Sequence, residues 1–175
     1  MDLKARIREI PDWPKKGVNF KDITTLLQDK EAFQKAVDLL AAPLLGIGID
    51  KAAGIDARGF LLAAPVAYKI KAGLAIARKP GRLPYETVEQ SYTLEYASNI
   101  IQMHRDAILP GEKVALIDDL IATGGTALAA CDLIEKLGGR VAAVSCLIDL
   151  PFLGGSKKLK ERGYLVRSLI EYQSE

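Results

Sequence analysis

Short apolar runs alternate along the chain with longer stretches in which apolar residues recur every three or four positions. The apolar runs are typical of strands in a parallel sheet, and they fall at 51–55, 74–77, 114–117, 141–148 and 164–170. Helical periodicity is found at 30–42, 60–70 and 128–137. This order predicts an α/β protein with a parallel sheet and helices on both of its faces.

Local signals add the connections between these elements. Asp29 is predicted to cap the helix over 30–42. Two prolines and Gly17 exclude helix and central strand from segment 10–17, so we expect an ordered leader there. Loose alternation over 87–96 indicates a hairpin. Because no repeat, linker or low-complexity segment is apparent, we expect residues 1–175 to form a single domain.

Composition narrows the class of protein. The chain has 175 residues, 49% of them hydrophobic and 26% charged, as in globular proteins with a sizeable core. A net charge of +2 gives no electrostatic argument for nucleic acid or a membrane surface as partner. The apolar runs are far shorter than the ~20 residues of a membrane-spanning helix. The first residues lack the apolar core of a secretory signal.

Cysteine and histidine are scarce. Cys131 and Cys146 fall on a predicted helix and a predicted strand, where we expect both to pack as small apolar residues. Without a disulfide framework, the expected location is the cytoplasm. The single histidine, His104, excludes a zinc site built from several histidines and disfavours a Ser-His-Asp triad. Any metal should be a hard cation held by oxygen atoms, many of them from the substrate.

The apolar run at 114–117 leads into an acidic pair and a turn of small residues. Two adjacent carboxylates, Asp118 and Asp119, can accept hydrogen bonds from vicinal hydroxyls. Small residues at the start of a helix leave backbone N–H groups free to surround a phosphate. The turn consists of Ala122, Thr123, Gly124, Gly125 and Thr126. This order predicts a site for a phosphorylated sugar, the alternative being a helix cap or an ordinary surface turn.

Basic residues follow the two preceding strands. Arg58 comes after the strand at 51–55, and Arg78, Lys79 and Arg82 come after the strand at 74–77. Ligands of such sheets bind outside the carboxyl ends of the strands, so these cations and the acidic pair should share one edge. Together they suit a ligand that carries pyrophosphate and ribose. The alternative for any single arginine of the set is a solvated surface position.

Several segments resemble the adenine phosphoribosyltransferase family, over nearly the whole chain from 10 to 169. The stretch from Asp118 to Thr126 resembles the signature for 5-phosphoribosyl 1-pyrophosphate (PRPP) that many type I phosphoribosyltransferases share. Segments 17–23 and 91–96 resemble the adenine enzymes in particular, and segments 56–60 and 78–79 also match. The resemblance implies a type I phosphoribosyltransferase fold, with a small N-terminal hood at 1–30 and a flexible catalytic loop at 79–103.

The same resemblance implies transfer of phosphoribose from PRPP to adenine, giving AMP and pyrophosphate, with Mg²⁺ held mainly by the substrate. It also implies a homodimer. The acidic pair would hold the ribose hydroxyls, the turn 122–126 the 5′-phosphate, and Arg58, Arg78, Lys79 and Arg82 the pyrophosphate. Base recognition would involve stacking on Phe20 and main-chain groups of the segment formed by Val18, Asn19, Phe20 and Lys21.

Catalysis would involve Arg58 together with Glu95 and Tyr96 on the loop. Glu95 is a sensible acceptor or relay for the proton that leaves the base, and its alternative is a solvated hairpin acid. Lys21 stands where the family often has arginine, which puts a guanidinium-specific contact in doubt. Two other functions stay open: transfer to another purine base, and a PRPP-sensing regulator without catalysis.

Overall fold

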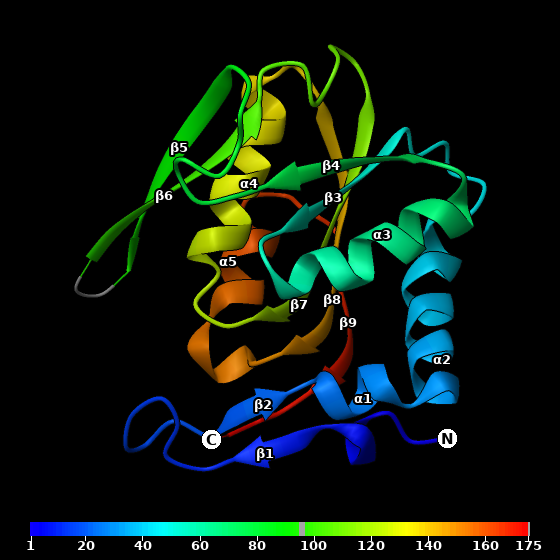
Figure 1. Ribbon diagram of the computed structural model, residues 1–175, viewed down its shortest axis with the longest axis vertical. Helices are drawn as coiled ribbons and strands as arrows, with labels where there is room; N and C mark the ends of the chain where they lie inside the picture. The colour runs from blue at the N-terminus through cyan, green and yellow to red at the C-terminus, as the bar shows by residue number, and fades with distance from the viewer. Residues whose placement is uncertain (95–96, 175) are drawn as a thin grey trace.

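A parallel five-stranded sheet forms the centre of the computed structural model, which describes residues 1–94 and 97–174 (Figure 1). The strand order is β4-β3-β7-β8-β9, and all four neighbouring pairs are parallel. The strands are β3 (Lys51–Ile55), β4 (Gly73–Ala77), β7 (Lys113–Ile121), β8 (Arg140–Asp149) and β9 (Val166–Glu171). The mixed α/β fold predicted from the apolar pattern is confirmed.

Helices cover both faces of this sheet, as predicted. The helices are α1 (Thr24–Gln28), α2 (Lys30–Ala41), α3 (Arg58–Ile70), α4 (Gly125–Lys136) and α5 (Gly155–Glu161), with short 3-10 turns η1 (Lys4–Arg6), η2 (Ala42–Leu44) and η3 (Pro151–Leu153). One core cluster joins α2 and α3 to the sheet through residues such as Leu40 and Leu62. The other joins α4 and α5 through Leu133 and Leu159. Burial of these apolar side chains stabilises both layers.

Two helix starts show how local sequence sets the boundaries. The Asp29 side chain accepts hydrogen bonds from the N–H groups of Glu31 and Ala32, which confirms the predicted cap of α2. Helix α4 begins at Gly125, three residues before the predicted start at 128. The early start places two small residues, Gly125 and Thr126, in the first helical turn.

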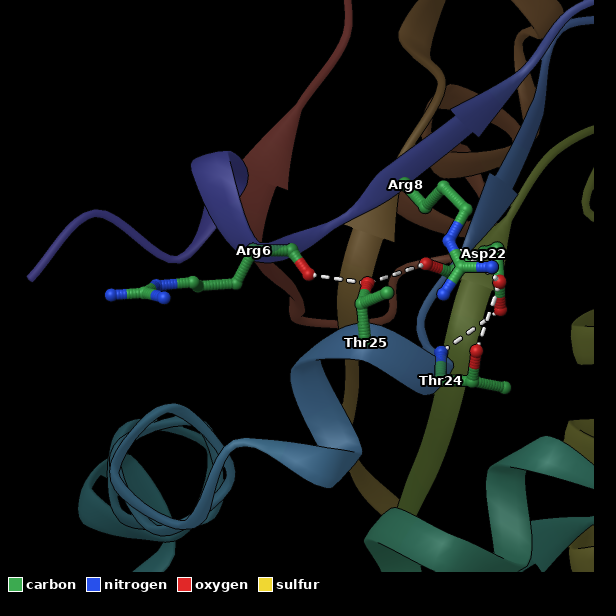
Figure 2. A network of polar contacts seen from close by, with 5 residues as sticks. All are labelled: Arg6, Arg8, Asp22, Thr24 and Thr25. Atoms are coloured by element: carbon green, nitrogen blue, oxygen red, sulfur yellow. Dashed lines mark hydrogen bonds and ion pairs between the residues drawn. The ribbon is translucent and has the colours of Figure 1, made fainter.

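Within residues 1–30, where a hood is expected, β1 (Arg8–Ile10) and β2 (Phe20–Asp22) form a two-stranded antiparallel sheet, which we call the hood. Figure 2 shows how Asp22 joins it to α1: its carboxylate accepts from the Thr24 N–H and hydroxyl, each at 2.9 Å. The Thr25 hydroxyl donates to the Arg6 carbonyl at 2.7 Å. Segment 11–19 between the strands has no regular structure, as predicted for the leader. The hood strands were not predicted, because each has only three residues.

The segment expected to be a loop at 79–103 is largely regular structure. Strands β5 (Thr87–Leu94) and β6 (Ala97–His104) pair in antiparallel register, so the hairpin expected over 87–96 is present and its second strand continues to His104. Figure 1 shows the hairpin projecting away from the central sheet beside α4. Its second strand is anchored because Ile101 and Met103 are buried in the core on the α4 side. Among the described residues, no helix is long and apolar enough to cross a membrane.

Candidate active site

The acidic pair lies inside strand β7 rather than after it, because β7 extends to Ile121. Asp118 and Asp119 are only 8% and 6% exposed. Oδ1 of Asp118 accepts a hydrogen bond from the Asp119 N–H at 2.9 Å. A Cβ on Gly59 would lie 2.7 Å from the same oxygen, so only glycine lets the first turn of α3 pack this closely against the carboxylate.

Burial perturbs both carboxylates. Loss of hydration, reinforced by the charge of Asp119, raises the pKa of Asp118 well above its ordinary value. Burial also raises the pKa of Asp119, although the Arg58 guanidinium opposes the shift. Two adjacent buried acids without a full set of partners are costly to the fold. Such a cost is typical of a functional site, which favours the ligand-binding interpretation over a surface turn.

Arg58 connects the acidic pair to the hood. Its Nε lies 2.9 Å from Oδ2 of Asp119, and its Cζ lies 5.0 Å from the centre of the Phe20 ring. The contact with Asp119 is an ion pair without hydrogen-bond alignment, so this buried oxygen keeps its capacity to accept from a ligand hydroxyl. Residues from β2, α3 and β7, far apart in sequence, therefore meet at one point.

The turn between β7 and α4, which we call the phosphate loop (122–126), presents donors only. The carbonyls of Ala122, Thr123 and Gly124 all accept hydrogen bonds. In the part of the chain that the structure describes, the N–H groups of residues 123–126 have no acceptor. With the positive end of the α4 dipole, these donors form a site for an anion.

Gly124 gives the phosphate loop its shape. Its φ of +83° lies in the left-handed region, and a Cβ there would meet Cα of Gly155 at 2.8 Å. A side chain at this position is therefore excluded twice, by backbone strain and by contact. Gly125 begins α4 and does not share this positive φ.

The predicted pyrophosphate-binding residues, which we call the basic set, are Arg58, Arg78, Lys79 and Arg82. Beside Arg58, only Arg78 of this set has its side chain held by contacts that the described residues show. Arg78 is held by an ion pair and a carbonyl: its Nε donates to Oδ2 of Asp56 at 2.9 Å and its Nη1 to the Arg82 carbonyl at 3.2 Å. Asp56 and Arg78 follow the neighbouring parallel strands β3 and β4. Lys79 and Arg82 are exposed.

The predicted base-binding segment divides into two parts. Phe20 is half-buried, with the Trp13 ring edge-on at 4.4 Å, and stays accessible beside Arg58. The Lys21 side chain turns the other way: it is 3% exposed, and its Nζ lies 2.7 Å from Oε2 of Glu9 and 4.2 Å from the Tyr172 ring centre. The Lys21 side chain therefore packs between β1 and Tyr172, which follows β9, and points away from Phe20.

Val18 and Asn19 of this segment make hydrogen bonds within the N-terminal region. Val18 donates its N–H to the Lys15 carbonyl at 3.2 Å and accepts from the Trp13 N–H at 3.1 Å. The side chain of Asn19 donates to Oε2 of Glu9 at 2.6 Å. The main-chain groups of Val18 are therefore used within the leader, and Phe20 and Lys21 pair with β1 as part of strand β2.

The hairpin supplies one wall of a cleft beside the phosphate loop. This cleft of about 560 Å³ is lined by Tyr92 of β5, Thr123 and Gly125 of the loop, and Lys158 and Arg162 of the α5 region. The acidic pair is not among its lining residues. The predicted catalytic residues Glu95 and Tyr96 lie outside the described residues.

Sequence reasoning missed three residues that shape the site. Asp56, which orients Arg78, could have been found because it too follows a predicted strand. Gly155 and Lys158 contact the phosphate loop from more than 30 positions away. No local signal marks them, since their role depends on how α5 packs.

A buried acid pair, an anion-binding loop and a strand-edge arginine on a parallel sheet define a phosphoribosyltransferase, and residues 24–172 match the phosphoribosyl transferase domain. The adenine phosphoribosyltransferase of Alkaliphilus metalliredigens is 55% identical over 172 residues, covering 98% of this chain and 100% of that protein. The crystal structure of the enzyme from Thermoanaerobacter pseudethanolicus has a TM-score of 0.93 at 48% identity and covers 97% of this chain and 98% of its own.

The Saccharomyces cerevisiae enzyme, solved in complex with adenine and an imino-altritol bisphosphate, is similar with a TM-score of 0.89 at 33% identity, and the match covers 95% of this chain and 96% of the yeast chain. The chain therefore belongs to the adenine phosphoribosyltransferase family.

Proposed function

We propose that this protein transfers the phosphoribosyl group of PRPP to N9 of adenine, giving AMP and pyrophosphate. The observation that carries the proposal is that Arg58 contacts both the Phe20 ring and the Asp119 carboxylate. It places an aromatic face, a guanidinium and a buried carboxylate in sequence at one edge of the sheet. A base, a leaving group and a ribose require such groups in this order.

The ribose phosphate half of the substrate fits β7 and the phosphate loop. Asp118 and Asp119 accept hydrogen bonds from the vicinal ribose hydroxyls, and the free N–H groups of 123–126 hold the 5′-phosphate. Fixing both ends of the ribose orients C1 toward the hood. Orientation of this kind lowers the barrier by removing freedom before the chemical step.

The leaving pyrophosphate fits the basic set. Arg58 and Arg78 sit at the ends of strands β3 and β4, and the exposed Lys79 and Arg82 extend the positive charge outward. As the bond at C1 breaks, positive charge builds on the ribose and negative charge on pyrophosphate. The cations stabilise the departing charge more than the ground state, which is the condition for catalysis.

A magnesium ion fits this site as a substrate-borne ion. No group of three or more acidic, cysteine or histidine side chains in the described ranges is arranged to hold a metal. The oxygen atoms of Asp118 and Asp119 suit a hard cation, and PRPP would supply most of the ligands. When bound, Mg²⁺ would neutralise part of the pyrophosphate charge.

Adenine fits against Phe20, with its edge toward the backbone of the segment 18–21. The stacked ring brings N9 toward C1 of the ribose, and the N9 proton needs an acceptor. We assign that role to Glu95 and place Glu95 and Tyr96 on a loop that closes over the site. Closure would exclude water, which otherwise hydrolyses PRPP.

An ultraviolet assay of base consumption with PRPP and Mg²⁺ tests the function. Adenine should be used with an efficiency about 10⁴ times that of hypoxanthine, because a site that hydrogen-bonds one base edge rejects an analogue with donors and acceptors exchanged. Guanine and xanthine complete the comparison. Use of any of these within tenfold of adenine would contradict the assignment of the base.

We further propose a homodimer in the cytoplasm. Leu61 and Tyr68 on α3 and Leu74 on the edge strand β4 are 49%, 89% and 46% exposed, which suits a face covered by a second copy. Both cysteines are free and buried, as suits a reducing compartment. Sedimentation equilibrium measures the mass of the assembly, and a monomer at micromolar concentration would contradict the dimer.

A further inference from the structure

A segment beyond the known signature holds the phosphate loop from behind. This segment, 150–158, runs from the end of β8 through η3 into α5. The Leu150 N–H donates to the Ile121 carbonyl at 3.0 Å, the Gly155 N–H to the Ala122 carbonyl at 3.0 Å, and Lys158 Nζ to the Thr123 carbonyl at 3.3 Å. Three consecutive carbonyls are thus bound by one segment, which we call the backing segment.

These three bonds determine where the loop donors point. In a trans peptide the carbonyl and the next N–H lie on opposite sides of the chain. Carbonyls turned toward the backing segment therefore turn the N–H groups of Thr123 and Gly124 away from it. Those are the donors that the proposed function assigns to the 5′-phosphate.

The contact is also too close for any side chain. A Cβ on Gly155 would lie 2.3 Å from the Ala122 carbonyl oxygen and 2.6 Å from the Gly124 nitrogen. Both atoms belong to the backbone of the phosphate loop, so neither can move without moving the loop. Gly155 has no positive φ, which means that close approach rather than conformation requires glycine there.

We propose that the backing segment sets the affinity of the enzyme for the phosphate of PRPP and AMP, with Gly155 and Lys158 as positioning residues. This inference rests on the proposed function. The two residues bind loop carbonyls and act on the substrate through them, by orienting donors before the ligand arrives. Preorganised donors bind an anion more tightly than donors that must be reoriented.

The test measures the affinity for AMP and for ribose 5-phosphate by calorimetry. Lys158→Met should raise both dissociation constants roughly three- to tenfold, the effect of losing one hydrogen bond. Gly155→Ala should raise them about tenfold or more, because the added methyl displaces the loop. In steady-state assays KM for PRPP should rise while kcat and KM for adenine change less than twofold, roughly, since the base half is untouched.

Matched controls separate positioning from general damage. Lys157→Met removes a neighbouring lysine that is 80% exposed and lies 3.8 Å from Oε1 of Glu161. Gly163→Ala strains the other end of α5, at φ +87°, where a Cβ would meet nothing within 4 Å. Both controls should bind AMP like the wild type, even if Gly163→Ala lowers the melting temperature. Lys158→Arg should restore most of the affinity, because it restores a donor.

The outcomes are distinct. A wild type that does not convert adenine contradicts the proposed function itself. If the wild type is active and a folded Gly155→Ala variant binds AMP normally, the positioning proposal is overturned, and a loss in Lys158→Met alone would then mean direct contact with the phosphate. Should Gly155→Ala fail to fold, unchanged affinity in Lys158→Met overturns the proposal by itself.

Discussion

Asp118 and Asp119 lie on the middle strand of a five-stranded sheet, and the phosphate loop directly follows that strand. Phe20 instead lies on a two-stranded sheet at the edge of the molecule. Strand β7 is paired on both sides, with β3 and β8, and is buried along most of its length. Among the described strands, β1 and β2 of the hood pair with each other and with no other strand. The half of the site that would hold ribose phosphate is therefore more deeply buried and has more strand pairing than the half that would hold adenine.

The forces that hold the two halves differ as well. Residues of the first half are fixed by burial and by main-chain hydrogen bonds. The hood strands themselves carry polar contacts, such as Arg8 with Asp22 at 3.7 Å and Lys21 with Glu9 at 2.7 Å, in which Arg8 and Glu9 are each about half exposed. The core residues Ile7 and Ile23 lie next to these strands rather than on them. Partly exposed ion pairs contribute little stability. We infer that the hood opens more readily than β7, which suits entry and exit of a base.

The largest expected effect on activity comes from the half of the site that would hold ribose phosphate. Replacing Asp118 and Asp119 together with asparagine should lower kcat/KM for PRPP by about 10²–10⁴, because charge-assisted hydrogen bonds contribute ~1.5–3 kcal/mol each. Circular dichroism should show an intact fold. A folded double variant with wild-type turnover would show that the pair is structural.

The same variant should be at least as stable as the wild type at neutral pH. Because the folded-state pKa values of both acids are raised, their ionisation is harder in the folded than in the unfolded chain. They therefore cost stability as the pH rises through the raised values and cost nothing below the ordinary carboxyl range. Calorimetric melting from pH 4 to pH 8 should show that the melting temperature of the variant rises relative to that of the wild type as the pH increases. The opposite trend would contradict the predicted shifts.

The next largest effect on ligand binding is expected from Gly124→Ala. The substitution combines a φ of +83° with a Cβ 2.8 Å from Cα of Gly155, so the phosphate loop must distort. We expect ribose 5-phosphate affinity to fall by about tenfold or more through strain of ~1–3 kcal/mol. Gly111→Ala, with φ +87° and nothing within 4 Å of its Cβ, is the control for strain alone. Equal affinities in the two variants would remove Gly124 from the site.

Sequence patterns predicted β7, its acidic pair and the phosphate loop far better than the hood. Buried parallel strands are long apolar runs, and the acids at 118 and 119 interrupt such a run conspicuously. The hood strands have three residues each, too few for a period of two to be recognised. The backing of the phosphate loop by Gly155 and the turning of Lys21 into the hood are tertiary contacts, which no local pattern encodes.

In the hood, Phe20→Ala should weaken adenine binding while sparing the ribose phosphate half. Loss of base–aromatic stacking costs about 1–3 kcal/mol, so KM for adenine should rise roughly five- to 150-fold. The dissociation constant of ribose 5-phosphate should stay at the wild-type value. Leu109→Ala, which removes a large apolar side chain that is 56% exposed, is the matched control. Parallel loss of affinity for both ligands would mean that Phe20 supports the whole site rather than the base.

The smallest effect on specificity is expected from Lys21→Met. The Lys21 ammonium contacts Glu9 of the hood and the ring of Tyr172, which follows β9, and methionine keeps most of the apolar stem. Its loss should lower the melting temperature slightly and adenine efficiency less than about tenfold, by loosening β2 against β1.

The ratio of adenine to hypoxanthine efficiency should nevertheless stay near 10⁴, since main-chain groups cannot be removed by this substitution. Parallel kinetics with both bases measure that ratio directly. A ratio that falls below about tenfold would mean that the lysine side chain leaves Glu9 to read the base, because only a side-chain contact could be lost with the ammonium.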